Sequence, residues 1–278
     1  MTLKIDLHSH STISDGVLSP AQLVTRAQEH GVQVLALTDH DETGGLDEAG
    51  QCARQAGLTF VPGVEISVTW AGRTVHIVGL HIAPDNETLN SGLDTVRAGR
   101  LDRAYEMANR LEKLGFTGVF DGAMAFVSNP ELISRTHFAR YLVQEGYCRN
   151  MQEVFDRYLG DDKPANVPVR WATLQQAVDW IRGANGIAVI AHPGRYNYTP
   201  QQFDQLFSEF RDLGGQAIEV VTGSHHPSEY ATYARVAQRY GFLASTGSDF
   251  HGPNDGRMEL GDLPPLPSDL TPVWHDWF

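Results

Sequence analysis

Short, β-rich apolar runs alternate with helical patterns along most of this chain. The runs cover 3–7, 32–37, 58–68, 74–82, 187–191, 217–221 and 242–246. Helical patterns lie between them, over 20–30, 45–56, 86–115, 173–184, 200–213 and 226–240. Strands that alternate with helices favour a mainly parallel α/β sheet, and seven strands in this length predict a (β/α) barrel as readily as an open sheet.

The segment 116–169 breaks this alternation. It contains two stretches of helical period, ELISRTHFARYLVQEGY and NMQEVFDRYL, before a loop-like stretch that begins DDKPANVP. We predict a small helical insertion between the fourth and fifth strands, so that 1–115 and 170–278 form the barrel. Because insertions after barrel strands lie on the carboxyl-terminal face, this one should cover the active site as a substrate cap.

Composition and charge exclude several classes of protein. The chain has 278 residues, of which 41% are hydrophobic, so a packed core is expected and global disorder is not. Cys52 and Cys148 are the two cysteines, too few for a disulfide framework or a cysteine-rich zinc site. The formal net charge of −13 argues against a surface for duplex nucleic acid, although local arginines or metal ions could still hold an anionic ligand.

The amino-terminal sequence MTLKIDLHSH has no basic segment followed by a long apolar run, so we expect no signal peptide. The apolar stretches, such as GIAVIA, are far too short to cross a bilayer. We therefore expect a cytoplasmic protein without a membrane partner, and the sequence predicts no protein partner.

Metal-ligand side chains fall at or near the end of nearly every predicted strand. His8 and His10 follow the first run with Asp15 in the loop beyond, and His40 follows the second. The later runs carry or precede Glu65, His76, His81, His192, Glu219, Asp249 and His251. In a parallel barrel the carboxyl ends of the strands meet at one rim, which would bring together residues that are distant in the sequence.

These residue types indicate a particular chemistry. Imidazole and carboxylate groups without thiolates suit Mn²⁺, Zn²⁺ or Fe²⁺, and their number implies two or three ions. Such a site can clamp both oxygens of a phosphoryl displacement and lower the pKa of a bridging water. Glu65 lies on a central strand and is our candidate for the carboxylate that holds the bridging hydroxide, together with His76, His192 and Asp249.

Not every histidine in the sequence needs a metal. For His30, His225, His226 and His275 we expect a position at a helix end or on the surface. His81 and Glu219 are ambiguous and could orient a ligand rather than act as one.

The motifs DLHSHSTISDG, ALTDHD, PGVEIS, AHPGR and GSDFHG, in this order, resemble the successive motifs of the PHP (polymerase and histidinol phosphatase) domain family. The resemblance implies a distorted, TIM-like barrel of seven strands with three metal sites, for which we favour Mn²⁺ and keep Zn²⁺, Fe²⁺ and Mg²⁺ as alternatives. By motif, the first implied site is His8, His10, Glu65 and Asp249. The second is Glu65, His76 and His192, and the third is Asp15, His40 and His251.

The insertion with its SRTHFAR motif resembles a stand-alone subgroup that includes 3′,5′-nucleoside bisphosphate phosphatases and 5′→3′ exoribonucleases. If Ser134 caps a helix, the segment Ser134, Arg135, Thr136 and His137 could hold a substrate phosphate with side chains and backbone amides. Gly194 and Arg195 follow His192 and form a second phosphate candidate at the rim. Trp171 could stack a base or, equally, anchor the return to the barrel.

We therefore expect a metal-dependent phosphoesterase that removes the 3′-phosphate from 3′,5′-nucleoside bisphosphates. One alternative is a 5′→3′ exonuclease acting on short single-stranded oligonucleotides, and another is a histidinol-phosphate phosphatase. A C–N amidohydrolase is disfavoured because no lysine ends a predicted strand to bridge two metals. An inactive PHP binding module is disfavoured because every motif position is present.

Overall fold

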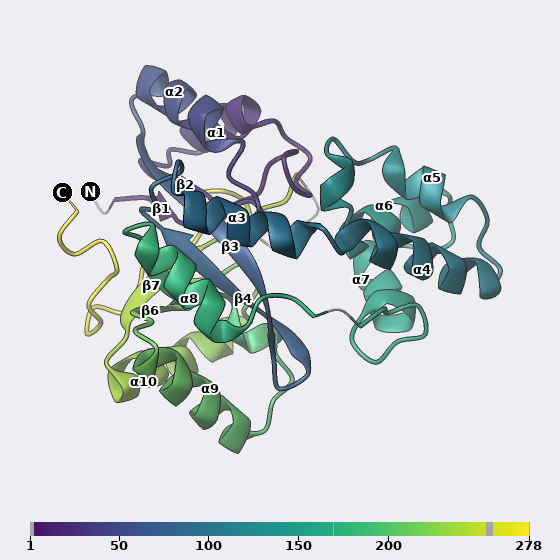
Figure 1. Ribbon diagram of the computed structural model, residues 1–278. Helices are drawn as coiled ribbons and strands as arrows, with labels where there is room; N and C mark the ends of the chain where they lie inside the picture. The colour runs from purple at the N-terminus through teal and green to yellow at the C-terminus, as the bar shows by residue number, and fades with distance from the viewer. Residues whose placement is uncertain (1–2, 169, 254–257, 278) are drawn as a thin grey trace.

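The computed structural model describes residues 3–168, 170–253 and 258–277 (Figure 1). Seven strands form one sheet in sequence order. They are β1 (Ile5–Asp6), β2 (Val34–Leu37), β3 (Thr59–Trp70), β4 (Arg73–Leu80), β5 (Ile187–Ile190), β6 (Ala217–Thr222) and β7 (Leu243–Gly247). The edges of the sheet meet, because Leu7 N donates to Thr246 O at 3.0 Å and Asp249 N donates to His8 O at 2.9 Å. The predicted seven-stranded barrel is confirmed.

One strand runs against the others. β4 pairs antiparallel with both β3 and β5, whereas the remaining pairs are parallel. The reversal follows from the tight turn at Ala71 and Gly72, which joins β3 and β4 as a hairpin. His76, opposite Ser67 near the start of β4, therefore lies at the rim where the parallel strands end.

The same reversal sets the position of His81. His81 follows the carboxyl end of β4, which lies at the opposite end of the barrel because the strand is antiparallel. There its ring packs 4.3 Å from the ring of Trp277 near the carboxyl terminus. His81, whose role the sequence left ambiguous, therefore lies away from the ligand residues.

Among the described residues, six helices pack around the barrel. They are α1 (Pro20–Glu29), α2 (Leu46–Ala56), α3 (Glu87–Arg97), α8 (Leu174–Gly183), α9 (Pro200–Asp212) and α10 (Tyr230–Tyr240). Three of them begin at capping boxes in which Ser19, Thr173 or Thr199 bonds the third helical residue, a glutamine that bonds back. Apolar side chains such as Leu7, Val34, Val78 and Val189 fill the barrel below the metal rim.

The predicted helical pattern over 86–115 divides into two helices at Ala98 and Gly99. The second of these, α4 (Arg100–Lys113), leaves the barrel and packs with α5 (Val119–Met124), α6 (Arg135–Gln144) and α7 (Met151–Val154) around a separate apolar cluster. Figure 1 shows this group of helices, in teal, beside the barrel. Within the described ranges, no helix is both long and apolar enough to cross a membrane.

Candidate metal centre

The loop after β1 is held in place by a buried carboxylate. Asp39 accepts hydrogen bonds from Ser11 N at 2.8 Å and from Ser11 Oγ at 2.6 Å, and Ser14 Oγ donates to it as well. These bonds fix the turn that carries Asp15 toward the barrel axis. Asp39 therefore shapes the site without facing it.

Glu65 lies at the centre of the rim, fully buried on β3. Five imidazoles lie 2.8 to 3.3 Å from its carboxylate oxygens: His8, His10, His40, His76 and His192. Two of them contact Oε1 and three contact Oε2. A single carboxylate that faces five ligand-type nitrogens through both of its oxygens has the arrangement of a bridge between metal ions.

One group of ligand atoms consists of His8, His10, Glu65 and Asp249. The two imidazole Nε2 atoms are 3.1 Å apart, and Asp249 Oδ1 lies 3.5 Å from His8 Nε2 and 3.4 Å from His10 Nε2. In a tetrahedral site with bonds of roughly 2.0–2.1 Å, neighbouring ligand atoms stand about 3.3 Å apart. The donor spacing of this group therefore fits one ion.

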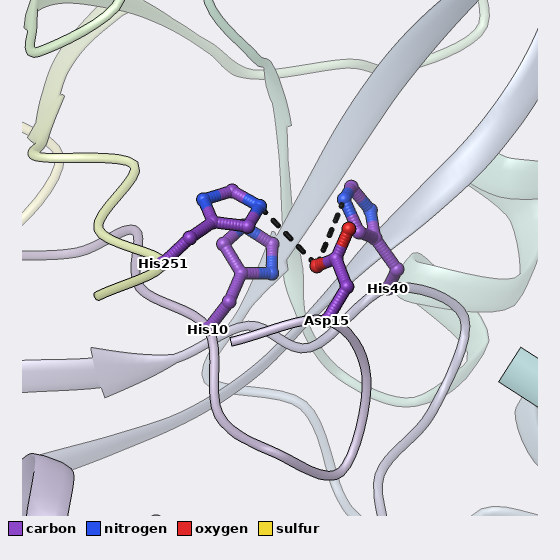
Figure 2. A group of neighbouring side chains, drawn as sticks. All are labelled: His10, Asp15, His40 and His251. Atoms are coloured by element: carbon purple, nitrogen blue, oxygen red, sulfur yellow. Dashed lines mark ion pairs between the residues drawn. The ribbon is translucent and has the colours of Figure 1, made fainter. Parts of the chain in front are cut away.

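A second group joins His10, Asp15, His40 and His251 (Figure 2). Asp15 Oδ1 lies 3.2 Å from His251 Nε2 and 3.7 Å from His40 Nε2. The ring of His10 stacks on that of His251 with 4.1 Å between centroids. A third group joins His40 and His76 through Glu65, and His192 contacts the same Glu65 oxygen as His76 at 2.9 Å.

Several ligand atoms are buried without a hydrogen bond. Within the described part of the chain, Glu65 Oε2, His40 Nδ1 and Asp15 Oδ1 have none, although the first two are only 2.9 Å apart. An unsatisfied buried polar group costs about 1–3 kcal/mol, more when it is charged. Divalent cations between these atoms would satisfy them, so the residues fit a metal cluster.

The charges of the site are mutually dependent. Burial raises the pKa of Glu65, but its interactions with the neighbouring imidazoles, those of His76, His8 and His40 first among them, outweigh burial and hold that pKa well below its usual value. Burial lowers the pKa of His10 to about 3 and that of His76 to about 4, so both are neutral as metal ligands require. Burial also opposes protonation of His8, yet Glu219, Glu65 and Asp249 raise its pKa well above the usual value.

One further carboxylate and two strained backbone positions hold the metal-ligand side chains in place. Glu219 contacts His8 Nδ1 at 2.7 Å and accepts a hydrogen bond from His192 N at 2.6 Å, so it orients two ligands at once. His192 and Asp249 have φ values of 26° and 56°, in a region that non-glycine residues rarely occupy. Such strain is concentrated at functional sites, where the surrounding contacts enforce it.

The predicted phosphate-binding segment reaches the metal rim. Ser134 caps α6, as expected, and its Oγ donates to Asp15 Oδ2 at 3.1 Å. Thr136 N donates to Ser134 Oγ, and His137 Nδ1 accepts from Ser134 N at 3.0 Å. Burial lowers the pKa of His137 to about 4, so it contributes a hydrogen-bonding group rather than a charge. Arg135 turns back toward Leu159 O, 3.2 Å away.

The second phosphate candidate also borders the ligands. Arg195 donates to Asp249 Oδ2 at 3.1 Å. Gly194 N donates to His225 Nε2 at 3.0 Å, and a Cβ at this glycine would lie only 2.7 Å from His225 Cδ2. The expectation that His225 lies at a helix end or on the surface is wrong, because it is 3% exposed and supports this loop.

Trp171 returns the chain from the insertion to the barrel. Its Nε1 donates to Thr74 Oγ1 at 3.1 Å, and the guanidinium groups of Arg100 and Arg103 lie 4.7 and 5.3 Å from its ring centroid. This packing favours a structural role, in which Trp171 anchors the chain to the barrel, over a role in stacking on a base. Arg100 also forms an ion pair with the buried Asp41, which follows His40.

With this geometry in place, comparison with known proteins identifies the family. The model of the PHP domain matches residues 6–222. The chain belongs to the PHP domain family. A 3′,5′-nucleoside bisphosphate phosphatase of Chromobacterium violaceum is 49% identical over 98% of this chain and 95% of its own length. A 5′-3′ exoribonuclease of Haemophilus influenzae is 43% identical over 99% of both.

A solved structure extends the PHP comparison to three dimensions. It is described as an amidohydrolase from Chromobacterium violaceum with bound sulfate and no metal. It superimposes on this chain with a TM-score of 0.95, at 48% identity, over 98% of this chain and 95% of its own. The predicted PHP resemblance is confirmed, and the family model matches residues 6–222.

Proposed function

We propose that this PHP-domain enzyme hydrolyses a phosphate ester of a nucleotide, removing the 3′-phosphate from 3′,5′-nucleoside bisphosphates. The proposal rests on the surroundings of Glu65. Its two carboxylate oxygens face five imidazoles, and Asp15 and Asp249 belong to the same cluster of ligand atoms. The 49% identity to a bisphosphate phosphatase over nearly the full length supports this choice of substrate.

The nine ligand residues would hold two or three divalent ions, with Mn²⁺ favoured by the mixture of imidazole and carboxylate. They are His8, His10, Asp15, His40, Glu65, His76, His192, Asp249 and His251. Bound ions would supply a water of lowered pKa and stabilise charge on the phosphate in the transition state.

The protein residues position the ester for that chemistry. Arg195 lies beside Asp249, where its guanidinium can pair with the oxygens of the scissile phosphate. Ser134, the N-cap of α6, donates to Asp15, and Arg135 is the next residue. The amino terminus of α6 therefore lies beside the metal-ligand residues. In this proposal Arg135 and Ser134 bind the phosphate that is not cleaved.

A second candidate is 5′→3′ exonuclease activity on short single-stranded RNA. It is supported by the exoribonuclease relative at 43% identity. Both activities place a nucleotide phosphate over the same metal-ligand residues. They differ in the substrate, which ends at one nucleoside in the bisphosphate and continues as a chain in RNA.

One comparison of substrates tests the proposal. The Mn²⁺-loaded enzyme is assayed with adenosine 3′,5′-bisphosphate, a short 5′-phosphorylated RNA, histidinol phosphate and a panel of C–N amides. We expect the largest kcat/KM for the bisphosphate, with AMP and inorganic phosphate as products. A larger kcat/KM for RNA would favour the exonuclease, and hydrolysis of amides alone would refute phosphoesterase activity.

A further inference from the structure

Four arginines lie close enough to affect one another's charge: Arg100, Arg103, Arg135 and Arg195. Buried carboxylates balance two of them, since Arg100 pairs with Asp41 and Arg195 with Asp249. The other two, Arg103 and Arg135, have no such buried partner in the part of the chain that the structure describes. Both are therefore available to an anionic ligand.

Arg103 is held by neutral groups. Its Nε donates to Val167 O at 2.9 Å, and its guanidinium lies over the ring of Trp171. Among the described residues no carboxylate forms an ion pair with it. Burial lowers its pKa to about 9, and the charges on Arg135 and Arg100 add to this effect. A cation in these surroundings favours the approach of an anion.

Arg135 has one acidic partner, which is partly exposed. Its NH1 donates to Leu159 O and to Asp161 Oδ1, both at 3.2 Å. The Asp161 side chain is 46% exposed and contacts Arg135 through a single oxygen. It lies in the loop after the π-helical turn Phe155–Leu159, so it can move into solvent without disturbing the apolar cluster of the insertion.

We infer that Asp161 takes the place of the substrate's second, uncleaved phosphate in the ligand-free enzyme and competes with that phosphate for Arg135. The inference rests on the proposed function. A phosphate offers three acceptor oxygens and more charge than a carboxylate, so it can pair with Arg135 and Arg103 together. Only a substrate with a second phosphate displaces Asp161, whereas a monoester held at the metal ligands leaves the pair intact.

The chain offers a matched control in the next residue. Asp162 carries the same charge on the same loop, but its side chain is 83% exposed and lies 3.5 Å from Arg73 instead. Asp161→Asn removes the competing charge at Arg135 and keeps the shape of the side chain. Asp162→Asn removes an equal charge a few ångströms away, so the pair of variants separates a local effect from a change in net charge.

Both variants and the wild type are assayed with adenosine 3′,5′-bisphosphate and with adenosine 3′-monophosphate, which lacks the second phosphate. For Asp161→Asn we expect KM for the bisphosphate to fall about three- to fivefold, the size of a partly exposed ion pair, with kcat unchanged. KM for the monophosphate should stay constant, as should all constants of Asp162→Asn. An unchanged or higher KM for the bisphosphate, or an equal fall for both substrates, would overturn the inference.

Binding of AMP, measured by calorimetry on the Mn²⁺-loaded proteins, separates this inference from the proposed function. AMP carries only the uncleaved phosphate, so Asp161→Asn should bind it about three- to fivefold more tightly than the wild type. If the wild type hydrolyses neither nucleotide, the proposed function fails, and AMP binding still decides the inference. AMP affinity that is equal or weaker in Asp161→Asn overturns the inference alone.

Discussion

At the scale of single residues, Glu65 is the side chain on which the site depends most. It is fully buried, and the imidazoles around it hold its pKa well below its usual value despite that burial. A carboxylate buried without cations would be strongly unfavourable, so its surroundings must supply protons or metal ions. The sequence predicts a bridging carboxylate here because Glu65 lies on a central strand, and the structure places five imidazoles 2.8 to 3.3 Å from its oxygens.

Substitution of Glu65→Gln should remove the bridge while keeping its volume. We expect the metal content after dialysis to fall below that of the wild type. The value of kcat/KM should fall by more than the roughly 10- to 100-fold typical of a residue that only orients a ligand. Elemental analysis and steady-state kinetics measure the two effects. Glu219→Gln is the control, for which the loss should stay within that 10- to 100-fold range; equal losses in both would argue against a bridge.

His225 shows what a residue-by-residue sequence analysis misses. It lies in a loop, GSHHPS, whose composition indicates a surface turn. Tertiary packing decides otherwise: its ring stacks on Tyr233 at 4.6 Å, and its Nε2 accepts from Gly194. Nothing local in the sequence distinguishes it from the exposed His226 beside it.

Burial lowers the pKa of His225, with a clear consequence for stability. Because the folded state disfavours the proton, stability from this group is present above the unfolded pKa of about 6.5 and is lost as pH falls below it. Between pH 7.5 and 5.5 the metal-free wild type should therefore lose more unfolding free energy than His225→Gln, which keeps an acceptor but cannot titrate. Urea unfolding at both pH values measures the difference, and identical losses would contradict it.

At the scale of elements, the hairpin of β3 and β4 and the position of α4 were the features that local patterns predicted least well. Alternating strands and helices gave the number of strands, but the direction of β4 depends on a turn of two residues. Helical period continued from α3 to α4 across Gly99, although the two helices pack on different apolar clusters. The periodicity of a sequence shows which face of a helix is apolar, but it does not show which apolar cluster that face packs against.

Arg100, at the start of α4, links the insertion to the barrel through Asp41 and Ser67 Oγ. Arg100→Ala leaves Asp41 buried without its cation, so we expect the free energy of unfolding to fall by about 3–5 kcal/mol. Glu106→Ala removes only the exposed pair with Arg110 on the same helix, so it should cost far less than Arg100→Ala. Denaturant unfolding of both proteins checks this, and similar losses would show that Arg100 has no special role.

At the scale of the whole molecule, the ring of ligands was predictable because it repeats a simple rule. In a barrel, strand ends meet at one rim, so ligand residues spread over 8–251 in the sequence arrive at one location. The supporting groups, such as Arg100, Asp161 and His225, were not predictable, because they act across the interface between barrel and insertion or between loops. Their contacts exist only once the elements are packed together.

In our proposal, the ring of ligand residues holds divalent ions for phosphoester hydrolysis. The most direct measurement removes all metal with a chelator, restores Mn²⁺ stepwise, and follows hydrolysis of adenosine 3′,5′-bisphosphate together with bound metal per chain. We predict no activity in the metal-free enzyme and full recovery once two or three ions are bound. Full activity in the metal-free enzyme would show that hydrolysis does not need these ions.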